Sequence, residues 1–188
     1  CLAIDMRPRV GSAVASPAGS PLVWHGHEMV FGFGVAVIAG FLLTAAQNWT
    51  GLPTPSGMPL AALFGVWLAG RLAFLLPGLP AAGVAVADLL FLPLLAFALA
   101  RPILRARQLH NYPFPLMLLA LFAANVLVHL ELLGLFAGAG LGLHLAVYVI
   151  VVMIVAMGGR VIPSFTDNRL QTRARRWKGV ERLVFPAT

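Results

Sequence analysis

The stretch from Trp24 to Gly51, WHGHEMVFGFGVAVIAGFLLTAAQNWTG, decides the fold, because two histidines and a glutamate precede a long uncharged apolar run. No ionisable residue occurs between Met29 and Ala46. At about 1.5 Å per residue, such a run is roughly long enough to cross the ~30 Å hydrocarbon layer of a membrane. Burying ionisable groups at its mouth is costly unless they are paired, protonated or metal-bound. The stretch therefore predicts a membrane helix with a candidate site at its entrance.

Composition supports the membrane assignment. The chain is 60% hydrophobic and only 10% charged, with a mean hydropathy of +0.91, which is too apolar for an ordinary soluble domain. The net charge of +7 does not indicate nucleic-acid binding, because the basic residues lie between the apolar runs and in the tail.

Cys1 is the only cysteine, which excludes an intrachain disulfide and a thiolate metal cage. Phosphate-loop, zinc-protease and serine-elbow motifs are absent, so nucleotide and hydrolase functions are not expected.

The apolar runs predict an all-α, polytopic transmembrane bundle of about five spanning helices. We expect a kink at Pro93, and we expect the last helix to end at the glycine pair Gly158 and Gly159. The predicted domains are a flexible lead over residues 1–23, the bundle over 24–166 and a basic cytoplasmic tail over 167–188. The predicted helices cover about 27–46, 58–76, 79–100, 113–133 and 139–157.

Because five spanning helices alternate in direction, the segments that connect them lie on opposite sides of the membrane in turn. The basic residues are distributed unequally between these two sides. Of 13 Lys and Arg residues, ten fall on the face where the first helix ends: three in the 101–113 loop and seven from residue 158 onward. The positive-inside rule makes that face cytoplasmic. The opposite, outward half then holds four of the five histidines, and His110 alone lies on the basic side.

These outward ionisable residues are the candidate site, since intramembrane ionisable groups are functional candidates by default. Imidazole is the commonest metal ligand and the usual axial ligand of haem iron. The candidate metal ligands are therefore His25, His27, His129 and His144. Arg71 suits a carboxylate or haem propionate, and Glu28 is a further cofactor-binding candidate. The residues expected to orient the ligands are Asp88, Asn125, Glu131 and Tyr148.

Each assignment has a structural alternative. His129 with Asn125, and His144 with Tyr148, fit hydrogen bonding between helices without any metal. Arg71 and Asp88 fit an ion pair. His25 fits a solvated helix cap, while the basic tail fits contact with anionic lipid headgroups.

Five motifs resemble the NnrS family of polytopic membrane proteins in order and spacing. They are Trp24-His-Gly-His-Glu-Met29, Gly40-Phe-Leu-Leu-Thr44, Asn48-Trp-Thr-Gly51, Gly70-Arg71 and Gly159-Arg-Val-Ile-Pro-Ser-Phe-Thr166. The resemblance covers residues 24–168. It implies a bacterial inner-membrane protein that carries haem and copper and takes part in the nitric-oxide response, denitrification and protection against nitrosative stress.

The resemblance also places His25, His27, Glu28, Arg71 and Arg160 on family motif positions without assigning their ligands, and it adds Arg160 to the residues expected to support the site. Family members are longer, so we expect this chain to be part of a larger protein whose other half, or a second copy, completes the assembly. Nitric oxide is the expected diatomic ligand and membrane lipid the expected surroundings. Whether the protein is an enzyme is not predicted.

Two other functions compete with a metalloprotein. A proton- or metal-coupled transporter would use the carboxylates and histidines as a path, and would show flux without a chromophore. A structural partner would use the same groups only to hold helices together.

Overall fold

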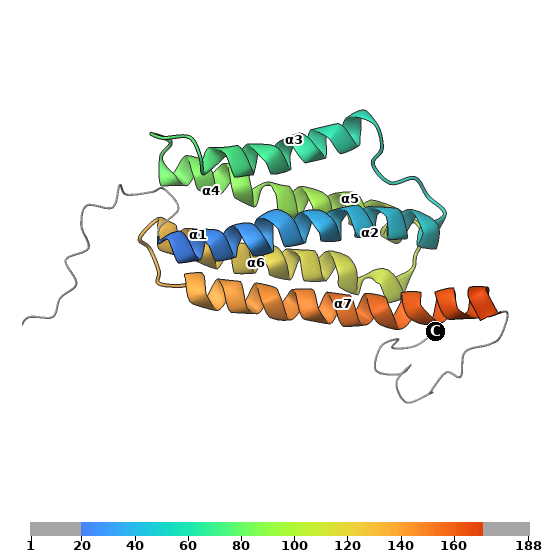
Figure 1. Ribbon diagram of the computed structural model, residues 1–188. Coiled ribbons are helices and arrows are strands. Elements are labelled where there is room, and N and C mark those ends of the chain that lie inside the picture. The colour runs from blue at the N-terminus through green and yellow to red at the C-terminus, as the bar shows by residue number, and fades with distance from the viewer. Residues whose placement is uncertain (1–19, 171–188) are drawn as a thin grey trace, which may run out of the picture.

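The computed structural model describes the backbone of residues 20–170 and the side chains of residues 20–162 (Figure 1). These residues form an all-α bundle, which confirms the predicted fold class. Four of its helices are long and apolar enough to span a membrane, and a fifth, α3, is shorter, so the described chain is a multi-pass membrane protein. The predicted flexible lead, apart from its last four residues, and the end of the predicted tail lie outside the described residues.

The first span consists of three consecutive helical segments: α1 (Pro21–His27), the π-helix η1 (Glu28–Gly34) and α2 (Val35–Thr50). It begins earlier than the predicted residue 27, because the Ser20 hydroxyl caps the first turn by accepting from the Val23 amide at 3.3 Å. It ends at Gly51, whose left-handed φ of 66° is easily adopted by glycine.

The next helices are α3 (Met58–Ala73), α4 (Ala81–Leu89) and α5 (Phe91–Arg105). The break between α4 and α5 at Leu90 confirms the kink expected near Pro93: proline has no N–H for the carbonyl of Leu89, and its ring crowds that carbonyl. Helix α5 extends past the predicted residue 100, so Arg101 and Arg105 belong to the helix rather than to the following loop.

A short 3₁₀ turn, η2 (Leu109–Asn111), leads into α6 (Pro113–Leu132), which matches the predicted helix closely. Helix α7 (Ala139–Leu170) contradicts the prediction that the last helix ends at Gly158 and Gly159. Glycine in a helix costs only about 1 kcal/mol. The Arg160 guanidinium lies over the Trp49 and Phe114 rings, at 5.6 and 4.9 Å from their centroids, and this packing stabilises the turn that contains the glycines.

The helices lie side by side and alternate in direction, as expected for successive membrane spans (Figure 1). One end of the bundle gathers the start of α1, the end of α3, the start of α4, the end of α6 and the start of α7. We call this the histidine end. The loops α2–α3 and α5–α6 lie at the other end.

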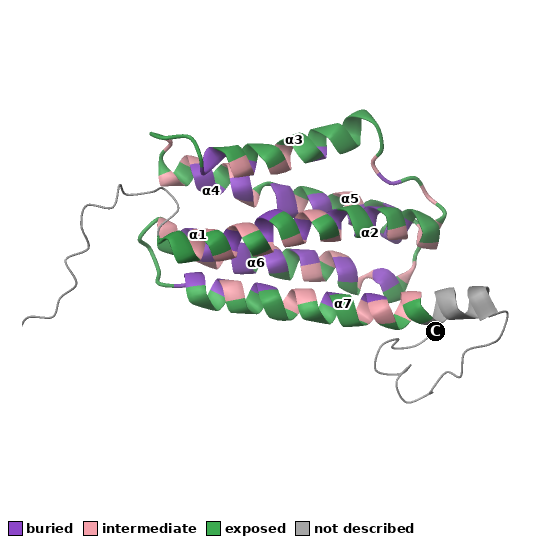
Figure 2. Ribbon diagram, in the orientation of Figure 1, coloured by how far each residue is buried: buried purple, intermediate pink, exposed green. Residues whose placement is uncertain are grey.

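Leucines fill the centre of the bundle, where α2, α5 and α6 meet: Leu42, Leu95, Leu118 and Leu121 are at most 1% exposed. The outer faces of the helices are also apolar and remain exposed, as Figure 2 shows in green. Phe33, Phe64, Phe97 and Ile154, for example, are all more than half exposed. Exposed apolar side chains are typical of helices that contact lipid, which agrees with the membrane-spanning helices of the described chain.

Candidate metal centre

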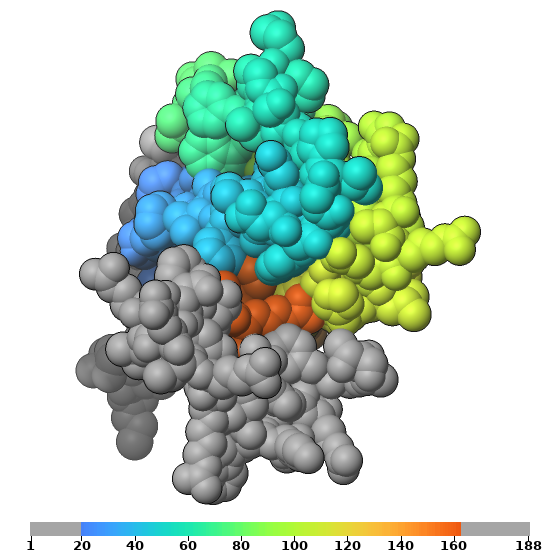
Figure 3. Space-filling model, turned by 90° about the vertical axis from the view of Figure 1, so that its right-hand side faces the viewer, coloured from blue at the N-terminus to red at the C-terminus, as the bar shows by residue number. Residues whose placement is uncertain are grey.

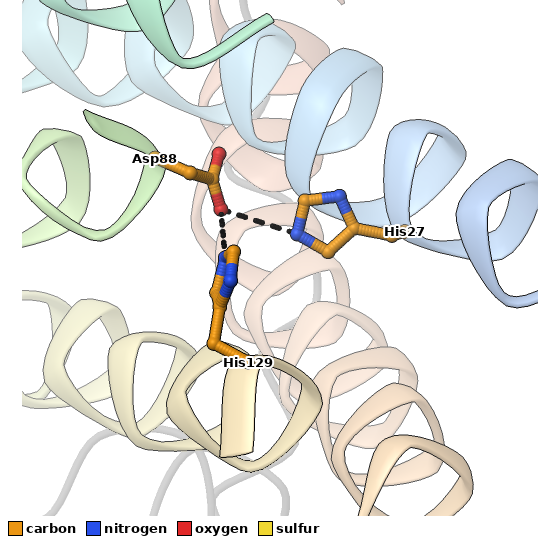
Figure 4. A group of neighbouring side chains, drawn as sticks. All are labelled: His27, Asp88 and His129. Atoms are coloured by element: carbon orange, nitrogen blue, oxygen red, sulfur yellow. Dashed lines mark hydrogen bonds and ion pairs between the residues drawn. The ribbon is translucent and has the colours of Figure 1, made fainter. Parts of the chain in front are cut away.

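Three buried side chains converge near the histidine end, each from a different span (Figure 4). His27 is the last residue of α1, Asp88 lies near the end of α4, and His129 lies in the last turn of α6. They are 1%, 4% and 1% exposed, respectively. Each offers one ligand-type atom, and these atoms all lie within 4.8 Å of one another. We call these three residues the His–Asp–His group.

The Asp88 carboxylate is the centre of this group. Its Oδ2 atom lies 2.8 Å from His129 Nε2 and 3.1 Å from His27 Nε2. The amide of Asn125, one turn before His129, donates to the same oxygen at 2.8 Å, and its Oδ1 lies 2.9 Å from His27 Nε2. Because both neighbours of His27 Nε2 are oxygens, that nitrogen carries a proton and donates it.

A second layer of charge lies beside the group. Arg71, from α3, is paired with both the other oxygen of Asp88 and Glu28 Oε1, the latter at 2.7 Å. The alternative considered for Arg71 and Asp88, an ion pair, is therefore present. Glu28 Oε1 also lies 3.4 Å from His27 Nδ1. Two carboxylates thus surround a single guanidinium beside the imidazoles, and this balance of groups favours a bound cation.

Two glycines allow the helices to approach closely enough to form this cluster. A Cβ on Gly32 would lie 2.9 Å from a Glu28 carboxylate oxygen and 3.0 Å from an Arg71 nitrogen. A Cβ on Gly70 would lie 3.0 Å from the Asp88 Cα. Glycine at both positions therefore makes room for the Glu28–Arg71 pair and brings α3 against the backbone of Asp88.

The π-helix sets the direction in which His27 points. A π turn holds one residue more than an α turn and therefore rotates the preceding residues relative to the rest of the helix. Trp67 of α3 donates its indole N–H to the Gly32 carbonyl within this segment at 3.1 Å. Since π segments occur frequently at functional sites, this local departure from α geometry agrees with a site at His27.

Aromatic rings seal the imidazoles from their surroundings. Phe31 and Phe74 lie 5.1 and 5.0 Å from the His27 ring centroid, and Phe74 stacks at 5.9 Å on His129. Sequence reasoning did not identify these two residues, because phenylalanine in an apolar helix carries no distinguishing signal. The Nδ1 atoms of both imidazoles are buried. His27 Nδ1 has only the Glu28 carboxylate near it, at 3.4 Å, and His129 Nδ1 has no hydrogen-bond partner among the described residues. A buried polar atom without a partner is unusual in a native protein, and such atoms often face a bound ligand, ion or water.

The structure thus gathers six of the predicted site residues into one cluster: His27, Glu28, Arg71, Asp88, Asn125 and His129. It also gives Asp88 a more central position than the orienting role predicted from sequence. Depth along the helices had suggested that all the outward groups lie together, but only those that also face the bundle interior meet.

The other predicted site residues lie elsewhere. His25, His144 and Tyr148 are exposed, and His144 Nδ1 lies 2.7 Å from the Gly140 carbonyl of its own helix. Glu131 caps the start of α7 by accepting from the Ala139 amide at 2.7 Å. Arg160 lies at the opposite end of the bundle, where it donates to Asn111 Oδ1 and, at 2.7 Å, to the His110 carbonyl.

Fold and site together define a multi-pass helical membrane protein with a buried histidine–carboxylate cluster that could hold a metal ion. The chain belongs to the NnrS family, because the model of that family, described as NnrS protein, matches residues 4–188. This match confirms the resemblance seen in the motifs. No curated protein and no solved structure matches the chain.

Proposed function

We propose that this chain is a bacterial inner-membrane metalloprotein of the nitric-oxide response and that it binds copper through His27, Asp88 and His129. The observation that carries the proposal is the convergence of two imidazoles and one carboxylate, all buried, from three different spans. Membership of the NnrS family supports the link to nitric oxide. The outward orientation of the cluster rests on the distribution of basic residues.

The donor atoms suit a transition-metal ion. Imidazole nitrogen favours copper, zinc, iron and nickel, whereas magnesium and calcium prefer sites made only of oxygen. The two carboxylates of the cluster, Glu28 and Asp88, lower the cost of holding a cation in a low-dielectric surrounding. A metal bound there would supply an open coordination position for a small diatomic molecule such as nitric oxide.

The residues around His27 can stabilise the tautomer of its ring that metal binding requires. Without a cation, His27 Nε2 donates to Asp88 and Asn125. If that nitrogen served as a metal ligand, the proton of the imidazole would have to reside on Nδ1. There the Glu28 carboxylate, at 3.4 Å, is placed to accept it, and Arg71 holds Glu28 in position. Such a carboxylate fixes the tautomer of a ligating histidine and orients its ring.

Haem fits the His–Asp–His group less well than a single ion does. The two imidazole centroids are 5.5 Å apart, and phenylalanine rings pack against both imidazoles. A macrocycle would have to displace these rings. If the chain binds haem, the exposed His25 and His144 at the same end are the better axial candidates, because their rings are open to a ligand or a second copy of the chain.

Transport is less well supported, although the same cluster could hold a proton or an ion. A carrier needs a continuous row of polar groups that extends from one side of the membrane to the other. Between the cluster and the other end of the bundle, the described core consists of leucines such as Leu42, Leu95 and Leu99. The polar groups of the described chain therefore gather at its two ends.

The proposal is tested by metal analysis of the protein purified in detergent from copper-supplemented and haem-supplemented cells, with visible spectra recorded before and after nitric oxide. We expect about one copper ion per chain and a spectrum that changes with nitric oxide. His27→Ala and His129→Ala should lose the metal, whereas His25→Ala, which removes an exposed histidine from the same motif, should retain it.

Asp88→Asn complements the histidine variants, because it keeps the side-chain volume and one ligand oxygen while removing the charge. We expect weaker copper binding with unchanged helical content by circular dichroism. Absence of metal and haem from folded wild-type protein would contradict the metalloprotein proposal. Ion flux in vesicles containing such metal-free protein would favour the transporter.

A further inference from the structure

An open pocket of about 400 Å³ lies at the end of the bundle opposite the His–Asp–His group. Figure 3 shows this end of the molecule, with the α2–α3 loop in cyan and the segment after α5 in yellow-green. The loop and the last turns of α5 line the pocket together, and their polar side chains there are Thr54, Ser56, Arg101 and Arg105. This pocket is separate from the cluster described above and does not depend on the proposed metal.

Two arginines give the pocket its charge. Arg101 and Arg105 are one turn apart and therefore lie on the same side of α5. The carboxylates among the described side chains, on Glu28, Asp88 and Glu131, all lie toward the histidine end, and none of them pairs with either arginine. The positive charge that lines the pocket is thus available for an anion from outside the described chain.

The start of α3 adds to this positive potential. Ser56 and Pro59, on either side of its N-cap residue Gly57, both line the pocket. No side chain caps this helix end, so the positive end of the helix dipole is not neutralised by a capping group. The Ser56 hydroxyl, two guanidinium groups and a helix N-terminus together suit a phosphate, whereas the Thr54 hydroxyl already donates to Gln47 Oε1 at 3.3 Å.

The other wall of the pocket is apolar and continues onto the lipid-facing surface. Phe97 lines the pocket, is 63% exposed, and lies under the Arg101 guanidinium at 5.7 Å from its ring centroid. Leu94 and Leu104, on the same helix, are also exposed. A ligand that fills this site therefore has an anionic head and a long apolar body that runs along α5.

We propose that this pocket binds an anionic phospholipid, with the phosphate between Arg101 and Arg105 and the acyl chains against Phe97 and the outer face of α5. The location agrees, because basic pockets between membrane helices on the cytoplasmic side typically bind anionic lipid headgroups, and the basic loops place this end at the cytoplasm.

The test uses native mass spectrometry of the purified chain titrated with phosphatidylglycerol, phosphatidylcholine or inorganic phosphate. We expect phosphatidylglycerol to bind more tightly than phosphatidylcholine. A large excess of inorganic phosphate should leave the binding of phosphatidylglycerol unchanged. Arg101→Gln and Arg105→Gln should each weaken phosphatidylglycerol binding about fivefold.

Arg107→Gln is the matched control, because Arg107 is an exposed arginine of the following turn that does not line the pocket. It should bind phosphatidylglycerol like the wild type. Equal binding by the wild type and the two pocket variants would overturn the proposal, as would an equal loss in Arg107→Gln, which would indicate attraction to the basic surface in general. Displacement by inorganic phosphate would show that the site takes the anion and not the lipid.

Discussion

At the scale of single residues, the site depends on positions where a side chain is missing as much as on those where one is present. Gly70 brings α3 so close to α4 that an added methyl group would meet the backbone of Asp88 rather than a side chain that could move away. The polar contacts of Arg71, the next residue, require this close approach. Gly70 therefore links helix packing directly to the electrostatics of the cluster.

Gly70→Ala should accordingly destabilise the protein by about 1–3 kcal/mol, because α3 must shift away from α4. Gly65→Ala is the control: it lies on the same helix, and a Cβ there meets nothing within 4 Å. Both changes gain the same helix propensity, of about 1 kcal/mol at most. Thermal unfolding in detergent compares the two variants. A melting temperature of Gly70→Ala equal to or above that of Gly65→Ala would contradict the packing argument.

Arg160 supports a second prediction at this scale. It bonds to Asn111 and the His110 carbonyl and stacks on Trp49 and Phe114, which joins α7 to the start of α6 and the end of α2. Arg160→Lys keeps the charge but loses the planar fork and its stacking. We expect a loss of stability of roughly 1–2 kcal/mol with metal content unchanged. Loss of metal without loss of stability would show that Arg160 acts on the cluster.

At the scale of elements, the π-helix from Glu28 to Gly34 is the feature that aims His27 into the bundle. Deleting Phe33, which is 67% exposed, should convert the π segment into ordinary α-helix. Residues before the deletion would then turn by about 100° relative to α2, which would carry His27 away from Asp88. We expect the metal to be lost while helical content is retained.

Phe33→Ala is the control for the deletion, because it removes the same side chain and keeps the register of the helix. It should bind metal like the wild type. A deletion variant with full metal content would show that the π segment is not needed to place His27.

The sequence was sufficient to predict most of the helices. Uninterrupted apolar runs marked the spans, and Pro93 marked the break between α4 and α5. The end of α7 was predicted wrongly, because the contacts that hold Gly158 and Gly159 in the helix come from Trp49, Asn111 and Phe114, which are remote in sequence. Local signals could not reveal them.

The site was predictable in depth but not in direction. Distance along each helix placed the ionisable residues at one level of the membrane, since every residue advances about 1.5 Å. Which side chains face one another depends on the rotation of each helix, and here that is set by the π segment, the break at Leu90 and the contact at Gly70. His27 and His129 therefore meet Asp88, whereas His25 and His144 at a similar depth remain exposed.

At the scale of the whole molecule, the bundle has two polar ends separated by a leucine core. The histidine end carries the cluster, while the other end carries the pocket lined by Arg101 and Arg105. The positive-inside rule predicts that the histidine end faces outward. The His–Asp–His group would then lie in the outward half of the membrane, and the lipid pocket would open toward the cytoplasmic leaflet.

Cysteine labelling tests this orientation. In a Cys1→Ser background, Leu135→Cys lies in the exposed α6–α7 turn and His110→Cys in the exposed turn before α6. A membrane-impermeant maleimide added to spheroplasts should label position 135 and should reach position 110 only after lysis. The reverse pattern would place the cluster at the cytoplasmic face and contradict the proposed topology.

The most direct test of the central claim is electron paramagnetic resonance of the purified chain loaded with one equivalent of Cu²⁺. Coordination by His27 and His129 predicts hyperfine coupling to two imidazole nitrogens, reduced to one in His129→Gln and unchanged in His144→Gln. A wild-type spectrum of unbound copper, or one that the His129 change leaves unaltered, would show that the His–Asp–His group is a structural hydrogen-bond network and not a metal site.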